Sequence, residues 1–560
     1  MNVPLSALIW FPAIGALLLQ LLGFVKKEKD IKSIAVLFTT VALGLNLAVL
    51  SKSNSGTYLF QAVESVSWIE NLGIRYLVGY DGISFWLTVL TTLMTLIIVV
   101  ATPDTTKNLR GFFGLVLLLE TAMLGSFCAL DLVLFFSFFE LTLIPMFFLV
   151  SLWGGPNRNK AAAKFVIYTF AGSIFMLVGI VALAIQHQKV TGQLDFSIIN
   201  IQASVASGKF WANALQAQTF IFWALALGFM VKTPAFPFHS WIGDTYAESP
   251  TAGPILSSVM VKMGSYGFLR FCLPLFPEAV QSQAPVFMAI ATIGILYGAL
   301  VAIAQTDMRR MIAYSSLSHM GFVLLGIFSL SYKGMIGGSF QQFSHGITTG
   351  LLVILVGYLV EKHGTADMNA FGGLKAKMPL FAGLFLLGML GSVGLPTTNG
   401  FIGEFLALMG AYETGARGLF GLSPGFAIAS GLGVVLGAVY LFVMFQKVFY
   451  GPVKVTEGPD WQDIPVSKAL PAFVLVFFVF VGGLYPNLFF GPMEASTQAT
   501  RLMAISEATK RPSWKDKPEE VTIRVALEDP MQGQYIRAGS ERLISSARLH
   551  GNVDEKREIR

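Results

Sequence analysis

Val231-Lys-Thr-Pro-Ala-Phe-Pro-Phe-His-Ser-Trp241 follows a long apolar run and decides what kind of fold the chain can adopt. Lys232 stands two residues before Pro234, at the end of a helix that the proline must interrupt, because its ring removes a backbone donor and clashes with the preceding turn. Pro237 repeats the interruption. If this helix lies in a bilayer, its freed carbonyl groups need protein or water as partners, so the break marks a buried site or a water-filled path.

The composition is that of a polytopic helical membrane protein. Of the residues, 54% are hydrophobic and only 12% are charged, and a membrane-spanning helix needs about 20 mostly apolar residues. We therefore expect an all-α membrane domain over residues 1–500 and a soluble extension over residues 501–560, where 12 basic and 10 acidic residues gather. The sequence predicts fourteen transmembrane helices, near residues 4–24, 32–50, 82–101, 112–129, 131–153, 164–186, 212–232, 251–272, 284–304, 311–330, 336–360, 379–409, 421–449 and 468–490.

Lysine and arginine indicate the orientation of the predicted helices. Seventeen of these residues lie in the odd-numbered connections and seven, Arg270 among them, in the even-numbered ones. Cytoplasmic loops of membrane proteins carry an excess of basic residues, so we expect the odd-numbered connections to face the cytoplasm and both termini to face the other side. Twelve more basic residues lie in the extension, which leaves only Lys232 and Lys262 within the predicted helices.

Charged residues in the middle of predicted helices are the main candidates for function. A charge at the bilayer centre costs roughly 3 kcal/mol on insertion scales, so such residues usually face the interior of a helix bundle and mark ion or proton routes. The structural alternative is a neutral side chain that is hydrogen-bonded within the bundle. The candidates are Glu120, Glu140, Lys232, Lys262 and Glu404.

Four further residues are secondary candidates. Lys164 begins a predicted helix, where its side chain can also simply extend to the interface. His239 follows the break, and His319 and His345 stand in apolar helices. Histidine titrates near neutral pH and can pass a proton through either ring nitrogen, although a single histidine in a polar-lined helix is often only a structural hydrogen-bonding group. No metal-binding spacing joins these histidines.

A second interruption occurs at Gly394-Leu-Pro-Thr-Thr-Asn-Gly400, shortly before Glu404. Paired discontinuous helices at corresponding places are the best sequence indication of an inverted-repeat transporter, with binding sites near the midplane at the breaks. The sequence therefore predicts two inverted-topology repeats of five helices, near residues 112–272 and 284–449, each with one broken helix.

Several ordered motifs resemble those of one protein family. They are Glu140 with Pro145 and Trp153-Gly-Gly, Val231-Lys-Thr-Pro with His239-Ser-Trp, Lys262-Met-Gly-Ser-Tyr-Gly with Arg270, and Ala313-Tyr-Ser-Ser-Leu-Ser-His319-Met-Gly. Over about residues 80–450, the sequence is similar to the antiporter-like proton-pumping subunits of complex I, namely the M subunit of bacterial NADH-quinone oxidoreductase and its mitochondrial, chloroplast and cyanobacterial equivalents. Glu404 resembles the bacterial M and mitochondrial type, since the other antiporter-like subunits usually have lysine there. The sequence departs from the family at Pro396-Thr-Thr, where members commonly have a Pro-Gly pair.

The resemblance implies a proton-translocating membrane-arm subunit of an NADH (or related donor):quinone oxidoreductase. It implies that the chain is part of a translocase but holds no cofactor itself, with FMN, iron–sulfur clusters and quinone in partner subunits. The expected partners are the other membrane-arm and peripheral-arm subunits and the lipid bilayer, and not nucleic acid. The expected location is the bacterial inner membrane rather than the thylakoid. Two cysteines, Cys128 and Cys272, are too few for an iron–sulfur ligand set.

The charges and the resemblance together suggest a proton route. Glu140 and Lys232 are expected to form an ion pair at the first break, and separating this pair would lower the affinity of Lys232 for its proton. The proton would then pass to Lys262 and, through water and His345, to Glu404. The secondary candidates on branches of this route are His319, His239, Lys164 and Glu120.

Three other functions are compatible with the sequence. The protein could be a subunit of a multisubunit cation/proton antiporter, a membrane anchor of a hydrogenase complex, or a structural scaffold with inactive channels. Glu404 argues against the antiporter, because those relatives usually have lysine there. The cost of burying charges without using them argues against the scaffold.

Overall fold

The computed structural model describes residues 3–21, 27–212, 214–250, 259–454, 462–506, 512 and 514–515. Within these ranges, ten helices are long and apolar enough to cross a membrane, or eleven if α21 and α22, which are bent by 68°, count as one span. The predicted helical, polytopic membrane fold is therefore confirmed. The predicted count of fourteen helices is not.

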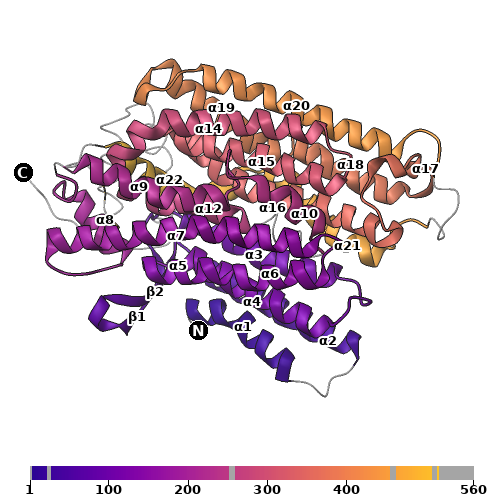
Figure 1. Ribbon diagram of the computed structural model, residues 1–560, viewed down its shortest axis with the longest axis horizontal. Helices are drawn as coiled ribbons and strands as arrows, with labels where there is room; N and C mark the ends of the chain where they lie inside the picture. Colours follow the sequence, from indigo (N-terminus) through magenta and orange to yellow (C-terminus); the bar gives the residue numbers. More distant parts are fainter. Residues whose placement is uncertain are drawn as a thin grey trace, which may run out of the picture.

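The N-terminal half begins with two helices and a β-hairpin and then forms the helices around the first break (Figure 1). In sequence order its elements are α1 (Leu5–Leu21), α2 (Glu28–Leu50), β1 (Gln61–Ile69), a 3₁₀ turn (Glu70–Leu72), β2 (Ile74–Tyr80), α3 (Gly82–Ala101), α4 (Leu109–Cys128), α5 (Leu132–Leu141), α6 (Leu143–Trp153), α7 (Arg158–Thr191), α8 (Ile198–Ala206), α9 (Leu215–Lys232), α10 (Ser240–Glu248), α12 (Lys262–Gly267), a π-helical turn (Phe268–Cys272) and α13 (Leu273–Leu275).

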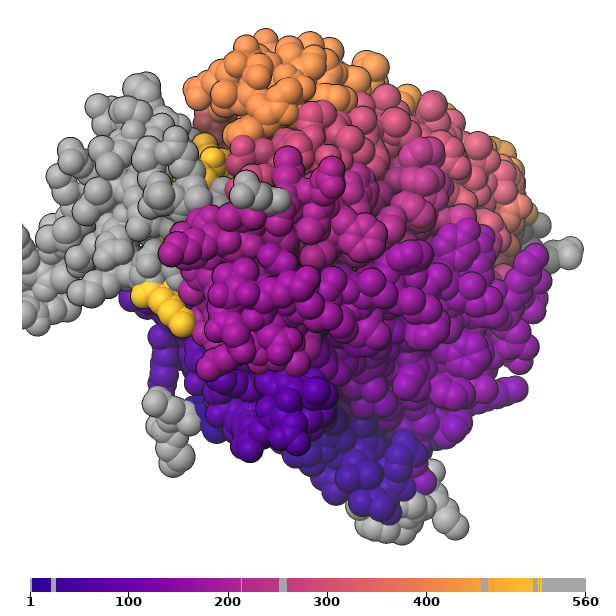
Figure 2. All heavy atoms as spheres, turned by 60° about the vertical axis from the view of Figure 1, so that its left-hand side comes forward, coloured from indigo at the N-terminus to yellow at the C-terminus, as the bar shows by residue number. Residues whose placement is uncertain are grey.

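The C-terminal half consists of helices that pack against the first half along its length. Its elements are α14 (Pro277–Ile303), α15 (Met308–Phe328), α16 (Tyr332–His363), a 3₁₀ turn (Met368–Ala370), α17 (Leu374–Lys377), α18 (Pro379–Val393), α19 (Asn399–Ala416), a 3₁₀ turn (Leu419–Gly421), α20 (Gly425–Phe449), α21 (Val466–Leu484) and α22 (Asn487–Ile505). In Figure 1 and Figure 2 the N-terminal half forms the lower part of the molecule, and Figure 1 shows α20 along the upper edge. α15 packs against α14, α16 and α19 of its own half and against α10 of the first half, and it is almost completely enclosed.

Several predicted helices differ from the structure at interruptions. The predicted helix near 131–153 is one span, but Thr142 divides it into α5 and α6. The one near 379–409 consists of α18 and α19 on either side of the second break, and the one near 468–490 crosses the bend between α21 and α22. The predicted helix near 251–272 lies partly outside the described residues.

The segment before α3 forms an antiparallel hairpin of β1 and β2, which the all-α prediction missed. The carboxylate of Glu64 on β1 accepts hydrogen bonds from the backbone amides of Leu5 and Ser6 and so ties the hairpin to the start of α1. Tyr80 is only 3% exposed and belongs to the core. The hairpin is held by these contacts as well as by its own ladder.

The first break lies between α9 and α10, as the two prolines predict. α9 ends at Lys232. The indole N–H of Trp241 donates to the carbonyl of Val231 at 3.0 Å, and the amide of Ala235 donates back to a carbonyl of α9 at 2.8 Å. Carbonyl groups freed inside hydrocarbon need protein partners, and here the interrupted stretch supplies them itself.

α12 packs onto the last turn of α9 through a glycine. A methyl group at Gly264 would lie 2.3 Å from the carbonyl oxygen of Phe229 and 2.8 Å from the amide nitrogen of Thr233. Backbone atoms cannot yield without shifting a helix, so only glycine permits this approach. The contact places Lys232 and Lys262 at the adjoining ends of two packed helices.

The second break contains a strained residue. α18 is followed by Gly394 with a φ of 76°, and Thr397 within the break has a φ of 87°. Glycine adopts this left-handed region readily, but a β-branched residue does so only with strain. Gly483 of α21 packs against the carbonyl oxygen of Thr397. Packing against α21 therefore keeps Thr397 in a backbone conformation that is unfavourable for threonine.

Arg270 is buried, which corrects its assignment to a connection. Its guanidinium, which is 0% exposed, forms two charge-assisted hydrogen bonds with the carboxylate of Asp81. Asp81 also caps α3 by accepting from the backbone amides of Ile83 and Ser84. A buried charge is tolerated only when it is paired and hydrogen-bonded, and this pair meets both conditions across two distant parts of the sequence.

The start of the predicted C-terminal extension packs on the membrane domain. Gln202 of α8 donates to the carbonyl of Pro512 at 2.7 Å and accepts from the amide of Trp514 at 3.0 Å. The Trp514 ring lies 4.5 Å from that of Phe60 and 5.8 Å from the Arg270 guanidinium carbon. The boundary predicted at residue 500 falls inside α22, and residues 516–560 of the predicted extension lie outside the described residues.

Substitution of Gly264 tests the contact between α9 and α12. We expect Gly264→Ala to destabilise the protein by about 1–3 kcal/mol, the usual cost of overpacking, because the two helices must separate. The melting temperature of the purified protein in detergent measures this loss. Gly357→Ala in α16 is the control, because a methyl group there meets no atom within 4 Å. Equal melting temperatures for the two variants would contradict the close packing.

Substitution of Thr397 tests the strain at the second break. Thr397→Gly should raise stability by about 1 kcal/mol, because relief of roughly 1–3 kcal/mol of backbone strain exceeds the entropy cost of glycine. The control is Thr398→Gly, because Thr398 has a φ of −104° and its hydroxyl donates to the carbonyl of Leu395. This control should lower stability. A decrease for both variants in thermal unfolding would contradict the strain.

Candidate functional site

Lys262 and His345 meet between the two halves of the molecule. The ammonium nitrogen of Lys262, on α12, lies 2.7 Å from Nδ1 of His345, on α16. Both side chains are buried. A second contact holds the same two helices, because the hydroxyl of Ser265 donates to the side-chain oxygen of Gln342 at 2.8 Å. The two residues that the sequence placed 83 positions apart are therefore direct neighbours.

His319 and Glu404 form the next contact. Nδ1 of His319, on α15, lies 2.6 Å from a carboxyl oxygen of Glu404, on α19. The amide of Gln341 donates to the same oxygen at 3.1 Å, and the hydroxyl of Ser392 lies 3.2 Å from Nε2 of His319. Every polar atom of the His319 ring thus has a partner.

The two contacts join into one line of titratable groups. The ring centroids of His319 and His345 are 5.5 Å apart. We call Lys262, His345, His319 and Glu404, taken in this order, the central cluster. It crosses α12, α16, α15 and α19, and all four side chains are buried. His319, a secondary candidate in the sequence, is a full member, since it is the group that contacts Glu404.

Glycines explain why α19 comes close enough to complete the central cluster. A methyl group at Gly403 would lie 3.0 Å from the α carbon of Gln341, and one at Gly337 would lie 2.8 Å from the amide nitrogen of Ala407. Small residues on both helices let backbones approach closely in membrane proteins. This approach carries Glu404 into reach of α16 and α15.

Lys232 and Glu140 do not form the predicted ion pair. The ammonium of Lys232 instead donates to the hydroxyl of Thr142 at 2.8 Å and lies 4.8 Å from the centre of the Phe139 ring. Glu140 is near enough to act on Lys232 through its charge, but it lies beyond 4 Å, and its Oε1 has no hydrogen-bond partner among the described residues. The interruption at Thr142 accounts for the difference, because it turns this hydroxyl toward the end of α9.

Lys164 pairs with Asp244 at 2.8 Å, and Arg310 lies 3.0 Å from the other oxygen of the same carboxylate. His239 follows the first break and packs against the rings of Phe236 and Tyr297. Its Nδ1 has no hydrogen-bond partner within the described part of the protein. These residues lie around the break but outside the central cluster.

Glu120 stands alone among the candidates. It is 0% exposed in α4, and neither carboxyl oxygen has a hydrogen-bond partner in the ranges that the structure describes. The structure does not bring it to any other candidate. Within the same ranges, no group of three or more histidine, cysteine or acidic residues is arranged to hold a metal ion.

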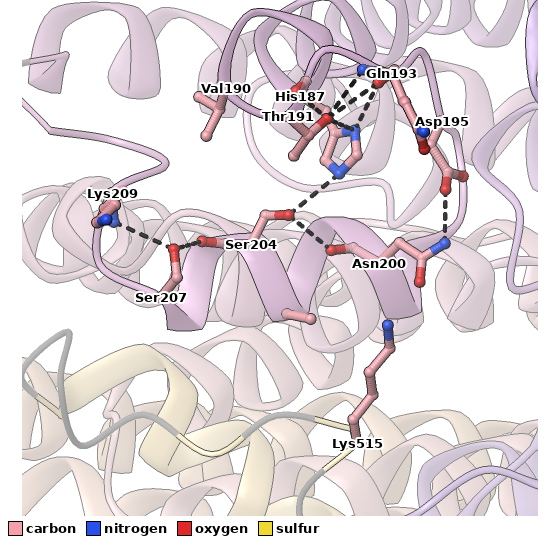
Figure 3. Close-up of a pocket in the computed structure, with 11 residues that line it drawn as sticks. His187, Val190, Thr191, Gln193, Asp195, Asn200, Ser204, Ser207, Lys209 and Lys515 are labelled. Carbon is pink, nitrogen blue, oxygen red and sulfur yellow. Dashed lines mark hydrogen bonds between the residues drawn. The ribbon is translucent and has the colours of Figure 1, made fainter.

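A polar groove of about 570 Å³ lies beside α8, away from the central cluster (Figure 3). In it, Nε2 of His187 lies 3.2 Å from the hydroxyl of Ser204, and the amide of Asn200 donates to Asp195 at 2.6 Å. Lys515 extends toward the groove from the C-terminal segment. These hydrogen bonds join α7 to α8, so we assign the groove a structural role.

The comparisons with known proteins agree with this geometry. The model of the family described as "NADH:quinone oxidoreductase/Mrp antiporter, TM" matches residues 129–428, which include the whole central cluster. The chain belongs to this family.

Relatives of this family member match it over most of their length. NADH-quinone oxidoreductase subunit M of Rickettsia bellii is 37% identical over 490 residues, which cover 86% of this protein and 95% of the relative. F(420)H(2) dehydrogenase subunit M of Methanosarcina mazei is 38% identical over 485 residues, which cover 86% and 94%. A subunit of respiratory complex I from Thermus thermophilus with bound NADH has a TM-score of 0.77 at 29% identity, and the match covers 89% of this protein and 99% of that subunit.

Sequence reasoning missed several polar partners of the candidate residues. Gln341 stands one helical turn before His345, and this polar pair in an apolar helix was an available signal. Ser392 and Thr142 gave no signal, because hydroxyl groups are common in membrane helices and usually bond to their own backbone. Asp244 lies in α10, where its charge looked like that of a surface residue.

Substitution of Glu404 tests the contacts of the central cluster. Glu404→Leu should destabilise this family member by about 1–3 kcal/mol, because His319 and Gln341 are left buried without their acceptor. Glu404→Gln should cost less, since its amide can still form hydrogen bonds. Glu413→Leu on the same helix is the control: its pair with Lys333 is partly exposed, and such pairs contribute about 0–1 kcal/mol. Equal thermal unfolding of the two leucine variants would contradict the contacts described.

Proposed function

We propose that this protein is a proton-translocating membrane-arm subunit of an NADH (or related donor):quinone oxidoreductase. The observation that carries the proposal is the central cluster, in which four titratable side chains follow one another inside a membrane domain. Buried titratable groups in transmembrane helices typically mark ion or proton routes. The relatives are named as subunits of an NADH-quinone oxidoreductase and of an F(420)H(2) dehydrogenase, so we propose that proton transfer is coupled to a redox reaction of that kind.

The proposed route runs from Lys262 through His345 and His319 to Glu404. Lys262 delivers a proton to Nδ1 of His345, the ring nitrogen that it already contacts. Nε2 of His345 has no hydrogen-bond partner among the described residues, so it is free to release a proton toward His319. That step needs a bridging water or a ring rotation, since the centroids are 5.5 Å apart. The final transfer, from His319 to Glu404, uses the 2.6 Å contact.

Lys232 is proposed to control proton entry through its charge. In the structure it is held by Thr142, with Glu140 close by but not paired. A shift in a neighbouring subunit that brings Glu140 to Lys232 would stabilise the protonated lysine, and the reverse shift would lower its affinity for the proton. The coupling energy would therefore enter at α5 and pass to the central cluster through the contact between α9 and α12.

The proposal extends to the surroundings of the protein. FMN, iron–sulfur clusters and quinone are expected in partner subunits of the membrane and peripheral arms, with NADH or, as in the Methanosarcina mazei relative, F(420)H(2) as the electron donor. The bacterial inner membrane is the proposed location, supported by the Rickettsia relative. The two broken helices are proposed to belong to inverted repeats near residues 112–272 and 284–449.

Variants of the central cluster test the proposed route. We expect Lys262→Met and His345→Leu each to lower the number of protons translocated per quinone reduced, because either change interrupts the only line of titratable groups between α12 and α19 in the described residues. The measurement is dye-reported acidification of proteoliposomes that contain the purified complex, with quinone reduction followed in parallel. Lys333→Met is the control, since this lysine pairs at the surface with Glu413.

Two results would overturn the proposal in different ways. An unchanged ratio of protons to quinone in both variants would exclude the central cluster as the route. Acidification that depends on added sodium or potassium and needs no quinone reduction would assign the protein to the antiporter members of the family.

A further inference from the structure

A cavity of about 860 Å³ lies between the two halves of the molecule at one end of the helices. Its walls come from the start of α2, the connection between α3 and α4, the end of α6, the starts of α7, α15 and α21, and the C-terminal part of α16. No member of the central cluster is among its described lining residues. The proposed proton route therefore leaves this cavity unexplained.

The charges that line the cavity do not balance. Five basic and two acidic side chains are among its described lining residues. Each acidic side chain is already paired with a lysine: Lys32 lies 2.9 Å from Asp104, and Lys468 lies 3.5 Å from Glu361. Three basic side chains remain, and among the described residues only one of them, Arg309, has an acidic neighbour, Asp307 at 3.8 Å, so the cavity favours an anion.

The three remaining basic residues are Lys107, Arg158 and Arg309. Among the described residues, the guanidinium of Arg158 donates to a backbone carbonyl, at 3.4 Å, and to no other group. Arg309 approaches Asp307 no closer than 3.8 Å, and its buried Nε has no hydrogen-bond partner among the described residues. A guanidinium donates well to phosphate oxygens. Arg309 lines the cavity and has one such donor, its Nε, without a partner among the described residues.

Uncharged polar residues, Thr102, Thr105, Thr106 and Ser249, also line the cavity, but a large part of its wall is apolar, which a soluble anion would not require. It includes aliphatic and aromatic side chains of α4, α6, α16 and α21, namely Phe112, Leu152, Val353, Ile354, Val360 and Pro471. Trp153 and Tyr358 also line the cavity, and such residues gather where membrane and water meet. A ligand that suits this cavity carries both a negative headgroup and an apolar tail.

The position of the cavity fits the membrane surface that is rich in anionic lipid. All five of its basic residues come from connections that the distribution of lysine and arginine assigns to the cytoplasmic side, and the structure brings them together at one end. Basic pockets between helices on the cytoplasmic side bind the headgroups of anionic phospholipids.

We propose that this cavity binds an anionic phospholipid. The phosphate lies among Lys107, Arg158 and Arg309, and an acyl tail follows the apolar wall of α16. Because the wall combines α2, α3, α4, α6 and α7 with α15, α16 and α21, the bound lipid connects the two halves of the protein. This role is separate from the proposed proton route.

The test measures lipid binding to the full-length protein in its native assembly. The assembly is purified, stripped of lipid with detergent and titrated with phosphatidylglycerol or with phosphatidylcholine, and bound lipid is counted by native mass spectrometry. We expect phosphatidylglycerol to bind more tightly, and Arg158→Gln/Arg309→Gln to weaken its binding about 30-fold, which is roughly 2 kcal/mol for two basic residues. High salt should reduce the preference for phosphatidylglycerol, because the attraction is electrostatic.

The control variant is Lys377→Gln/Lys447→Gln, which removes two positive charges from the same side without touching the cavity. It should bind phosphatidylglycerol like the unchanged protein. Lys107→Gln gives a milder third variant if the double arginine variant fails to assemble, and it should lose binding about fivefold. Melting temperatures without lipid confirm that each variant is folded.

Three outcomes would overturn the proposal. The first is equal binding of phosphatidylglycerol and phosphatidylcholine, and the second is an equal loss in the lysine control. The third is displacement of phosphatidylglycerol by inorganic phosphate, which would assign the site to a free anion. Proton translocation measured on the same preparations keeps this result separate, because the central cluster does not line the cavity.

Discussion

Hydrocarbon offers no hydrogen bonds, so the polar groups that this protein places in the membrane are stabilised by partners inside the protein. The first break meets this condition through Trp241, whose indole binds the carbonyl of Val231. The buried guanidinium of Arg270 meets it through the carboxylate of Asp81. The central cluster meets it by placing titratable groups in contact with one another. The contacts that meet this stability requirement also form the proposed proton route.

Glycine makes these contacts possible, because polar side chains on two helices meet only if the backbones come close. Gly264 brings α12 onto the end of α9, and Gly403 and Gly337 bring α19 onto α16. Without the second contact, Glu404 would lie too far from His319 for a hydrogen bond of 2.6 Å. The glycines of the broken and packed helices therefore determine which titratable groups become neighbours, although they take no part in proton transfer.

Composition and periodicity were enough to predict a polytopic helical protein and to single out Lys262, His345 and Glu404, because charges within apolar segments are few and costly. They could not predict that His319 touches Glu404, since the two residues are 85 positions apart and their contact depends on how α15 and α19 pack. Arg270 was misassigned because it stands near the end of an apolar run, where a charge usually reaches water. The hairpin was missed because its strands carry no helical period and only a weak alternation.

The two breaks differ in how their charges are satisfied, and this difference bears on the proposed coupling. At the second break, Glu404 has a histidine and an amide as partners. At the first break, the partners of Lys232 among the described residues are a neutral hydroxyl and aromatic rings, while Oε1 of Glu140 has no hydrogen-bond partner there. A buried ammonium close to a carboxyl group that does not pair with it is the more sensitive arrangement, because a short displacement would change both environments strongly in a medium of low dielectric constant. A conformational signal from a neighbouring subunit would therefore act more effectively on the first break, and the hydrogen-bonded central cluster would follow.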